Sequence, residues 1–245
     1  MTFRWRAVAL EEARPGGTVV VIDVLRAFTF EAWAFAHGAA RVLAVADADA
    51  ALRLARDVLP GSLAAGERGG RPLEGFDLGN SPVALDRHDV AGRTLVHRTS
   101  AGTPGLVRTA GSSLVIAASF VTAGATAQLL RARGVDDVTF VITGDSLGRD
   151  GDEDLACAEL IAARAAGDDP DPARFTARVA TSDAGRLFGP DGPEWAPEAD
   201  LHRACEVDQF TVALVASTPE PALPDGGSRA AVGDVVEVRA RTLGP

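Results

Sequence analysis

Short runs rich in valine, isoleucine and leucine alternate along this chain with longer, alanine-rich stretches. The runs have the length and composition of buried strands, and the stretches between them have the pattern of helices. The sequence predicts strands at 18–23, 41–46, 62–67, 94–97, 113–119, 137–144, 209–217 and 235–241, and helices at 28–39, 47–61, 103–110, 121–133 and 152–166. Because helices that alternate with strands cross over a sheet, this order predicts an α/β fold, with three α/β/α layers and a mainly parallel or mixed sheet.

Some segments carry more specific signals. Unbroken apolar strands are typical of a sheet that is covered on both faces. The run at 235–241 instead alternates polar and apolar residues, so we expect it to close the sheet as an edge strand. The proline- and aspartate-rich segment 168–173 is a candidate subdomain boundary within a single domain that spans 1–245, and the poorly patterned stretch up to about 205 is expected to be helical.

Composition excludes several classes of function. The net charge of −10 argues against a nucleic-acid partner, because a phosphate backbone demands a positive surface. No stretch approaches the roughly 18 apolar residues of a membrane span, and acids stand where a signal peptide needs an apolar run, so we expect a cytoplasmic protein. All 24 basic residues are arginine, which excludes a P-loop lysine and a Schiff base. The oligomeric state is open, and a homodimer is compatible with the sequence.

Polar side chains recur where the predicted strands end. Asp23 and Arg26 follow the first predicted strand, Glu67 ends the third, Ser100 follows the fourth and Ser119 ends the fifth. Ligands of open α/β sheets bind beyond the carboxyl ends of the strands. Carboxylates and hydroxyls suit Mg²⁺, and arginines suit phosphate or carboxylate oxygens. A carboxylate at any one strand end is ordinarily only a helix cap, but the recurrence favours a site for phosphoryl transfer.

Three familiar phosphatase and nucleotide-binding patterns are absent. Asp23 is followed two positions later by Leu25, so the Asp-x-Asp pair of aspartyl-phosphate enzymes is missing. Neither Cys157 nor Cys205 has an arginine six residues on, which excludes the Cys-x5-Arg signature. No Gly-x-Gly-x-x-Gly follows the first predicted strand, so a dinucleotide site is unsupported.

Five motifs in order along residues 20 to 160 resemble the 2-phosphosulfolactate phosphatase (ComB-like) family. They are VIDVLRAFTF (21–30), GERGGRPLEGFDLGNSP (66–82), RTSAGTPGL (98–106), ASFVTA (118–123) and GDEDLACAEL (151–160). The resemblance implies magnesium-dependent hydrolysis of 2-phosphosulfolactate to sulfolactate and phosphate, a step toward coenzyme M in methanogens. Two family asparagines are replaced here, by Ala101 and by Thr122. Because Ala101 cannot supply the donor and acceptor of an amide, the resemblance specifies the reaction class rather than the substrate.

The matched positions give the expected site. The expected catalytic residues are Asp23, Arg26 and Glu67, and the expected ligands of Mg²⁺ are Asp23, Glu67, Glu153 and Asp154. A small anionic phosphorylated substrate is expected to contact Asp77, Asn80, Ser81, Thr99, Ser100, Gly102, Thr103 and Ser119. Helix capping is the competing interpretation for the residues at 99–103 and for the two acids at 153 and 154.

For the mechanism we expect water to attack phosphorus directly while Mg²⁺ and Arg26 neutralise the phosphoryl oxygens. A phosphorylated Asp23 is the alternative route. Two other classes of function stay open on the sequence: a non-catalytic binding protein for an anionic metabolite, and a different hydrolase or lyase on the same scaffold.

Overall fold

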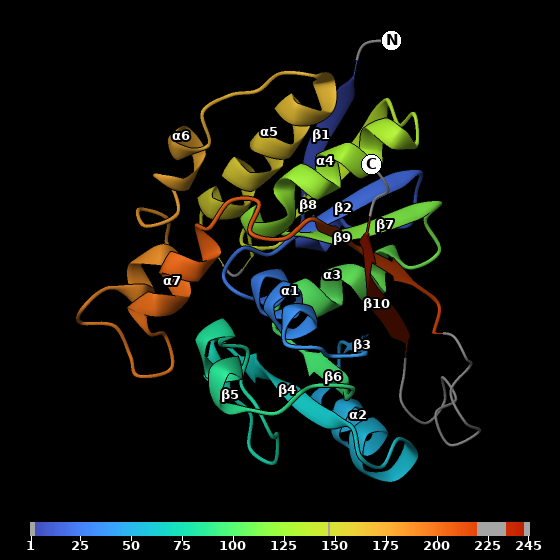
Figure 1. Cartoon of the computed structure of the whole chain (residues 1–245), viewed down its shortest axis with the longest axis vertical. Coiled ribbons are helices and arrows are strands. Elements are labelled where there is room, and N and C mark those ends of the chain that lie inside the picture. Colours follow the sequence, from blue (N-terminus) through green and yellow to red (C-terminus); the bar gives the residue numbers. More distant parts are fainter. Residues whose placement is uncertain (1–2, 147, 220–233, 243–245) are drawn as a thin grey trace.

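A computed structural model of the chain describes residues 3–146, 148–219 and 234–242. Its strands form one ten-stranded mixed sheet in the order β1-β8-β2-β7-β9-β10-β3-β6-β4-β5 (Figure 1). The strands are β1 (Arg4–Ala9), β2 (Thr18–Ile22), β3 (Arg41–Val45), β4 (Leu63–Arg68), β5 (Arg71–Pro72), β6 (Thr94–Arg98), β7 (Leu114–Ala118), β8 (Asp137–Ile142), β9 (Val212–Ser217) and β10 (Val235–Thr242). The predicted α/β class with a mixed sheet is confirmed.

The sheet consists of two parallel groups joined by two antiparallel strands. β1, β8, β2 and β7 run parallel to one another, and so do β3, β6 and β4. Between the groups, β9 pairs antiparallel with β7, and β10 pairs antiparallel with both β9 and β3. Three successive antiparallel pairings thus separate β7 from β3. Strands β3, β6 and β4 therefore run in the opposite direction to β1, β8, β2 and β7.

Helices cover both faces of each parallel group. They are α1 (Ala27–Ala36), α2 (Ala48–Arg53), α3 (Gly102–Thr109), α4 (Ala123–Ala132), α5 (Asp152–Ala166), α6 (Ala173–Thr176) and α7 (Glu198–Ala204). α1 and α3 lie between the two groups and share one apolar core with both (Figure 1). On the outer faces, α5 packs on β2 and β8, α4 packs on β7 and β9, and α2 packs on β3 and β6. Among the described residues, no helix is long and apolar enough to cross a membrane.

Sheet twist explains how the carboxyl ends of the two groups meet. Six steps across the sheet separate β2 from β4. At about 20–25° per step, the accumulated twist is of the order of 120–150°. This rotation turns the carboxyl ends of β4 and β6 toward that of β2, and residues following all three strands line one cavity.

The predicted edge position of 235–241 is wrong. β10 lies inside the sheet, and its alternation arises because Glu237 is buried beside Arg41 and Arg239 rather than exposed to water. The edge strand β1 was not predicted. The helix expected over 47–61 is an α-helix only to Arg53, capped by Asp47, and continues as π-helical turns over Leu54–Val58. The expected subdomain division near 168–173 stays a prediction.

Gly66 fixes the geometry of the strand that carries Glu67. Its φ is +149°, and a Cβ at this position would lie 1.9 Å from the carbonyl oxygen of Arg98 on β6. We expect Gly66→Ala to lower the free energy of unfolding by about 3 kcal/mol, because the two paired strands must move apart. Urea unfolding measures this loss. Gly61 also has a positive φ, +94°, but a Cβ there meets nothing within 4 Å. Gly61→Ala should therefore lose only about 1 kcal/mol, and equal losses in the two variants would contradict the steric argument.

Candidate active site

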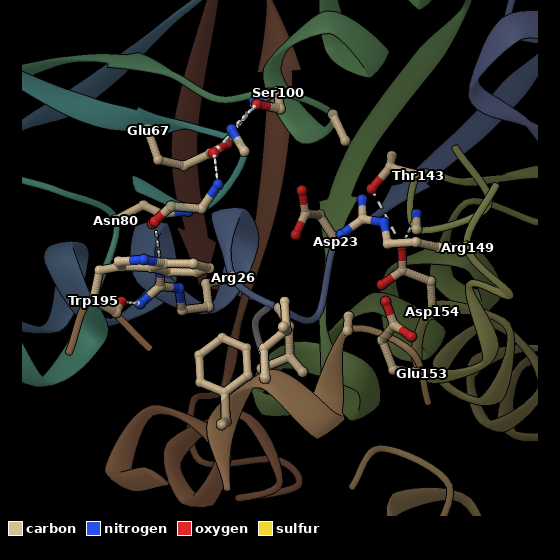
Figure 2. A pocket seen from close by; sticks show the side chains of 18 residues that line it. Asp23, Arg26, Glu67, Asn80, Ser100, Thr143, Arg149, Glu153, Asp154 and Trp195 are labelled. Atoms are coloured by element: carbon tan, nitrogen blue, oxygen red, sulfur yellow. Dashed lines mark hydrogen bonds between the residues drawn. The ribbon is translucent and has the colours of Figure 1, made fainter. Parts of the chain in front are cut away.

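A cavity of about 270 Å³ opens where β2, β4, β6 and β8 end. Figure 2 shows Asp23 near its centre, with Arg26, Glu67 and Asn80 on one side and Arg149, Glu153 and Asp154 on the other. Seven residues that the sequence analysis expected in the site line this one cavity: Asp23, Arg26, Glu67, Asn80, Ser100, Glu153 and Asp154. The two parallel groups of the sheet thus contribute to the same site.

Asp23 is a buried carboxylate at the turn from β2 into α1. Its Oδ1 accepts a hydrogen bond from the Ala27 N–H at 3.0 Å. Its Oδ2 lies 2.6 Å from where a Cβ on Gly102 would be, so the glycine leaves room for the carboxylate. Burial raises the pKa of Asp23 to about 6, and the negative charges of Glu67 and Glu153 add to this rise. The hydrogen bond from Ala27 and the positive charge of Arg149 oppose it. A carboxyl group with such a pKa can exchange protons near neutral pH.

Asp154 and Glu153 begin α5 but differ in what they contact. Asp154 accepts hydrogen bonds from Val24 N–H (2.8 Å), Gly144 N–H (2.7 Å) and Thr143 Oγ1 (3.2 Å), so it ties the turn after β2 to the end of β8. Burial and then the charges of Glu153 and Asp23 raise its pKa well above the ordinary value. Glu153 is buried, its Oε2 has no hydrogen-bond partner, and burial raises its pKa while a hydrogen bond with Ser182 opposes this.

Arg149 is a cavity residue that the sequence analysis missed. It lies in the loop between β8 and α5, its Nε is buried without a hydrogen-bond partner, and its charge lowers the pKa of both Asp23 and Glu153. Its place in the sequence, after the end of a predicted strand, could have identified it. An arginine in the connection after β8 follows the carboxyl end of a strand next to β2, as Arg26 follows β2 itself. The available guanidinium is suited to an anionic ligand.

The guanidinium of Arg26 is already hydrogen-bonded to other groups of the protein. Its Nη1 donates to Asp200 and to the Trp195 carbonyl, both at 2.7 Å, and its Nη2 donates to the Gly70 carbonyl at 3.1 Å. Both members of the Arg26–Asp200 ion pair are buried, and the guanidinium also lies over the Phe188 ring. Arg26 therefore joins α1 to the C-terminal part of the chain, and its expected contact with phosphate stays a prediction.

Glu67 organises the loop opposite α5. Its Oε1 accepts from Ser100 N–H at 2.5 Å, and its Oε2 accepts from Gly70 N–H at 2.5 Å and from Ser100 Oγ at 3.2 Å. Both carboxylate oxygens are thus already hydrogen-bonded. The neighbouring Asn80 is buried and its Oδ1 has no partner, which leaves an amide acceptor facing the cavity region without a donor.

The other expected substrate ligands serve the surrounding loops. Asp77 accepts from Ala64 N–H at 2.7 Å and pairs with Arg56, and Ser81 donates to Asp200 at 2.8 Å. Thr99 and Thr103 bond to each other at the start of α3, which is the capping role weighed from the sequence. Gly102 packs against Asp23, and Ser119 is buried at the turn after β7. None of these six lines the 270 Å³ cavity, although Ser81 lines an adjoining one.

The site is not a ready-made multidentate metal centre. Within the described part of the chain, no three His, Cys, Asp or Glu side chains form a group that could hold a metal ion together. The carboxylates with oxygens least committed to the protein are Asp23 and Glu153.

Buried acids, two arginines and small polar groups meet in a cavity beyond the carboxyl ends of the strands, which is where α/β enzymes bind their ligands. A sequence profile of the 2-phosphosulpholactate phosphatase family matches residues 6–187. The chain belongs to that family.

Curated relatives agree with the profile. A probable 2-phosphosulfolactate phosphatase of Parasynechococcus marenigrum is 44% identical over 147 residues, 59% of this chain and 60% of the relative. Proteins of the same name from Deinococcus radiodurans and Bacillus subtilis are 39% and 33% identical over 65% and 60% of the chain. The chain spans 60%, 66% and 63% of the length of these three relatives.

The raised pKa of Asp23 makes a prediction about stability. Because the pKa is about 6 in the folded chain and 3.8 ordinarily, the folded state binds the proton more tightly than the unfolded state. This contribution is fully present below pH about 4 and is lost as pH rises through about 6. We expect Asp23→Asn to be more stable than the parent by about 2 kcal/mol at pH 8, and the difference to vanish near pH 4.

Thermal unfolding from pH 4 to pH 8, with a chelator present so that no divalent cation compensates the charge, measures this difference. Asp191→Asn, at an exposed position, is the matched control and should change stability little at any pH. A parent protein that is as stable as the Asp23→Asn variant at pH 8 would show that burial of this carboxylate is not unfavourable.

Proposed function

We propose that the chain is a phosphatase that hydrolyses 2-phosphosulfolactate, or a closely related small acidic phosphoester, to the alcohol and inorganic phosphate. The observation that carries the proposal is that Asp23 shares one cavity with Arg149, whose Nε has no hydrogen-bond partner, and with Glu153, whose Oε2 has none. Membership of the family and the names of the relatives support this reaction and this substrate class.

The cavity residues fit a divalent cation bound by few protein ligands. Mg²⁺ usually keeps several waters and is held by one or two carboxylates together with the substrate phosphate. Glu153 Oε2 is a buried oxygen without a donor. Burial, and to a smaller extent neighbouring acids, raises the pKa of Asp23 and Glu153, and a bound cation would lower both pKa values. Of the four expected ligands Asp23, Glu67, Glu153 and Asp154, Asp23 and Glu153 would hold the ion. When bound, Mg²⁺ would supply charge neutralisation at the phosphoryl oxygens.

Arg149 would bind the phosphoryl oxygens through its guanidinium fork. Asp23 would accept a proton from the attacking water as the new O–P bond forms, and the leaving alkoxide would take up a proton from solvent as the ester P–O bond breaks. Asn80 and Ser100 lie on the opposite side of the cavity and would contact the remaining acidic groups of the substrate. Asp154 would hold the turn that carries Asp23 through its bond to Val24 N–H.

The direct test is phosphate release from 2-phosphosulfolactate and from a panel of phosphorylated carboxylates and sulfonates, with Mg²⁺ and with a chelator. We expect release from a small phosphorylated acid with Mg²⁺, and loss of release with the chelator. Release that the chelator does not affect would refute the metal part alone. No release from any substrate, with the phosphoester bound and recovered unchanged, would instead support the non-catalytic binding protein.

The two cavity arginines should respond differently to substitution. Arg149→Ala is expected to lower kcat about 10²–10³-fold, the scale for losing one charge-stabilising group, with little change in melting temperature. Arg149→Lys should not restore full activity, because lysine lacks the planar fork. Arg26→Ala is expected to destabilise the fold by about 3–5 kcal/mol, because Asp200 is left buried and unpaired. Steady-state kinetics and thermal unfolding of all three variants separate these roles. An Arg149→Ala variant with full activity would remove Arg149 from the mechanism.

A further inference from the structure

A separate stretch of chain covers the cavity. Residues 173–195, called here the roof segment, include α6 and the 3-10 turn Gly185–Phe188, and contribute Ala184, Leu187, Phe188 and Trp195 to the cavity wall. Leu187 is 39% exposed although it is a large apolar side chain.

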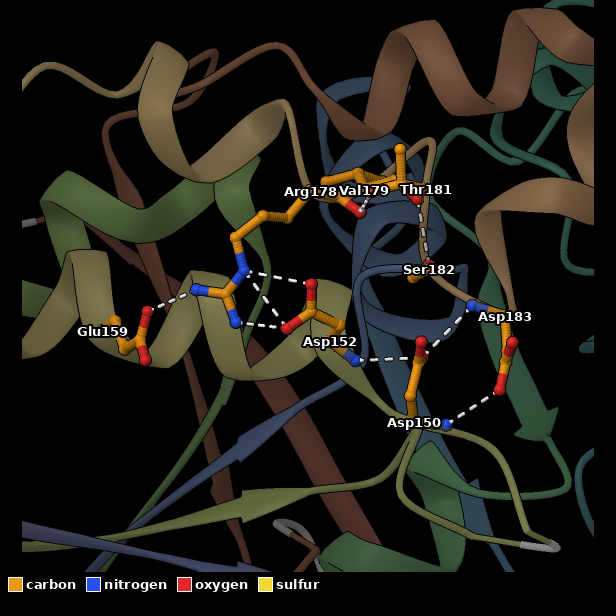
Figure 3. Close-up of polar contacts among 8 residues, drawn as sticks. All are labelled: Asp150, Asp152, Glu159, Arg178, Val179, Thr181, Ser182 and Asp183. Carbon is orange, nitrogen blue, oxygen red and sulfur yellow. Dashed lines mark hydrogen bonds and ion pairs between the residues drawn. The ribbon is translucent and has the colours of Figure 1, made fainter.

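One arginine attaches the roof segment to α5. Arg178 donates to both carboxylate oxygens of Asp152, one bond being 3.0 Å long, and to Glu159 (Figure 3). Asp152 and Glu159 are seven residues apart, so they lie on one face of the helix about 10 Å from each other along its axis. The guanidinium bridges the carboxylates of these two side chains, and Arg178 is only partly exposed, at 29%.

The same attachment reaches the catalytic carboxylate. Asp152, which is hydrogen-bonded to Arg178, directly precedes Glu153 in the chain. Ser182 of the roof segment is buried, accepts from Gly185 N–H at 2.9 Å and donates to the Val179 carbonyl at 2.9 Å, and its interaction with Glu153 opposes the rise in the pKa of that carboxyl. Between these points, Asp150 N–H donates to Asp183 Oδ2 and Asp183 N–H donates to Asp150 Oδ1, both at 3.1 Å (Figure 3). The roof segment and the first turn of α5 are therefore one hydrogen-bonded unit.

We propose that Arg178 is a positioning residue that couples the placement of the roof segment over the cavity to the orientation of Glu153. The inference rests on the proposed phosphatase function only in giving Glu153 a role. If the roof segment were merely a cover, its loosening would weaken substrate binding and raise KM alone. Because Glu153 is held by the same unit, loss of Arg178 should lower kcat as well as kcat/KM.

The experiment compares Arg178→Ala with Arg164→Ala. Arg164 is the matched control, because it lies in the last turn of α5, pairs with Asp208 at 2.8 Å and does not line the cavity. We expect Arg178→Ala to lower kcat/KM about tenfold to a hundredfold with a fall in kcat, the scale for a small displacement of a catalytic group. Arg164→Ala should leave both constants unchanged. Arg178→Lys should fall between, because one ammonium cannot bridge Asp152 and Glu159 as the guanidinium does.

Trypsin supplies a readout that needs no turnover, since the chain has arginines but no lysine. Cleavage after Arg174 and Arg186 reports opening of the roof segment, and cleavage after Arg98 in β6 reports global unfolding. We expect Arg178→Ala to accelerate the first two cuts and not the third. Unchanged roof cleavage with unchanged kcat would overturn the proposal, as would accelerated cleavage at all three sites. Absence of phosphatase activity in the parent protein would refute the proposed function while the cleavage pattern still tests the attachment.

Discussion

The buried ion pair between Arg26 and Asp200 is the interaction on which the arrangement around the cavity depends. Asp200 lies in α7 and accepts from Arg26 Nη1, Ser81 Oγ and Val83 N–H. Arg26 in turn donates to the carbonyls of Trp195 and Gly70. One pair thus joins the first turn after β2, the loop after β4 and the C-terminal helix. Removing either partner would leave an uncompensated buried charge, so the pair fixes the architecture even though a buried ion pair as a whole adds little net stability.

The opposite physical situation holds on the α5 side of the cavity. There Asp23, Glu153 and Asp154 are acids that burial and mutual repulsion hold at raised pKa values. Three hydrogen bonds stabilise the buried carboxylate of Asp154. Asp23 and Glu153 have fewer, and so keep free oxygens at the cavity. Perturbed carboxylates that the fold does not fully satisfy are typical of functional sites, because stability is sacrificed there for chemistry.

Local pattern was enough to predict most strands and the acids that line the cavity, since both depend on residues close together in the sequence. It was not enough for interactions that the topology alone creates. The sequence indicates that Arg26 is free to bind an anionic ligand, yet in the structure it pairs with the carboxylate of Asp200, 174 positions away. β10 reads as an edge strand because its polar residue Glu237 should face water, yet Arg41 and Arg239 accompany it inside the sheet. The roof segment has no periodicity to detect, and Arg178 and Ser182 acquire their roles only through contact with α5.

The charge balance of the cavity bears on how an anionic substrate can enter it. Its wall carries four carboxylates, Asp23, Glu67, Glu153 and Asp154, and two arginines, Arg26 and Arg149. The charge of Arg26 is already offset by Asp200, which leaves Arg149 as the cation on the wall whose Nε has no partner. A phosphoester with further acidic groups would add negative charge to this excess. On the proposed function, binding would therefore need protons on the acids with raised pKa values, or a cation held by Asp23 and Glu153, to compensate the added charge. The acids of the cavity wall would by themselves repel an anionic substrate. In the proposed function they would instead bind the proton or the cation that allows the anion to enter.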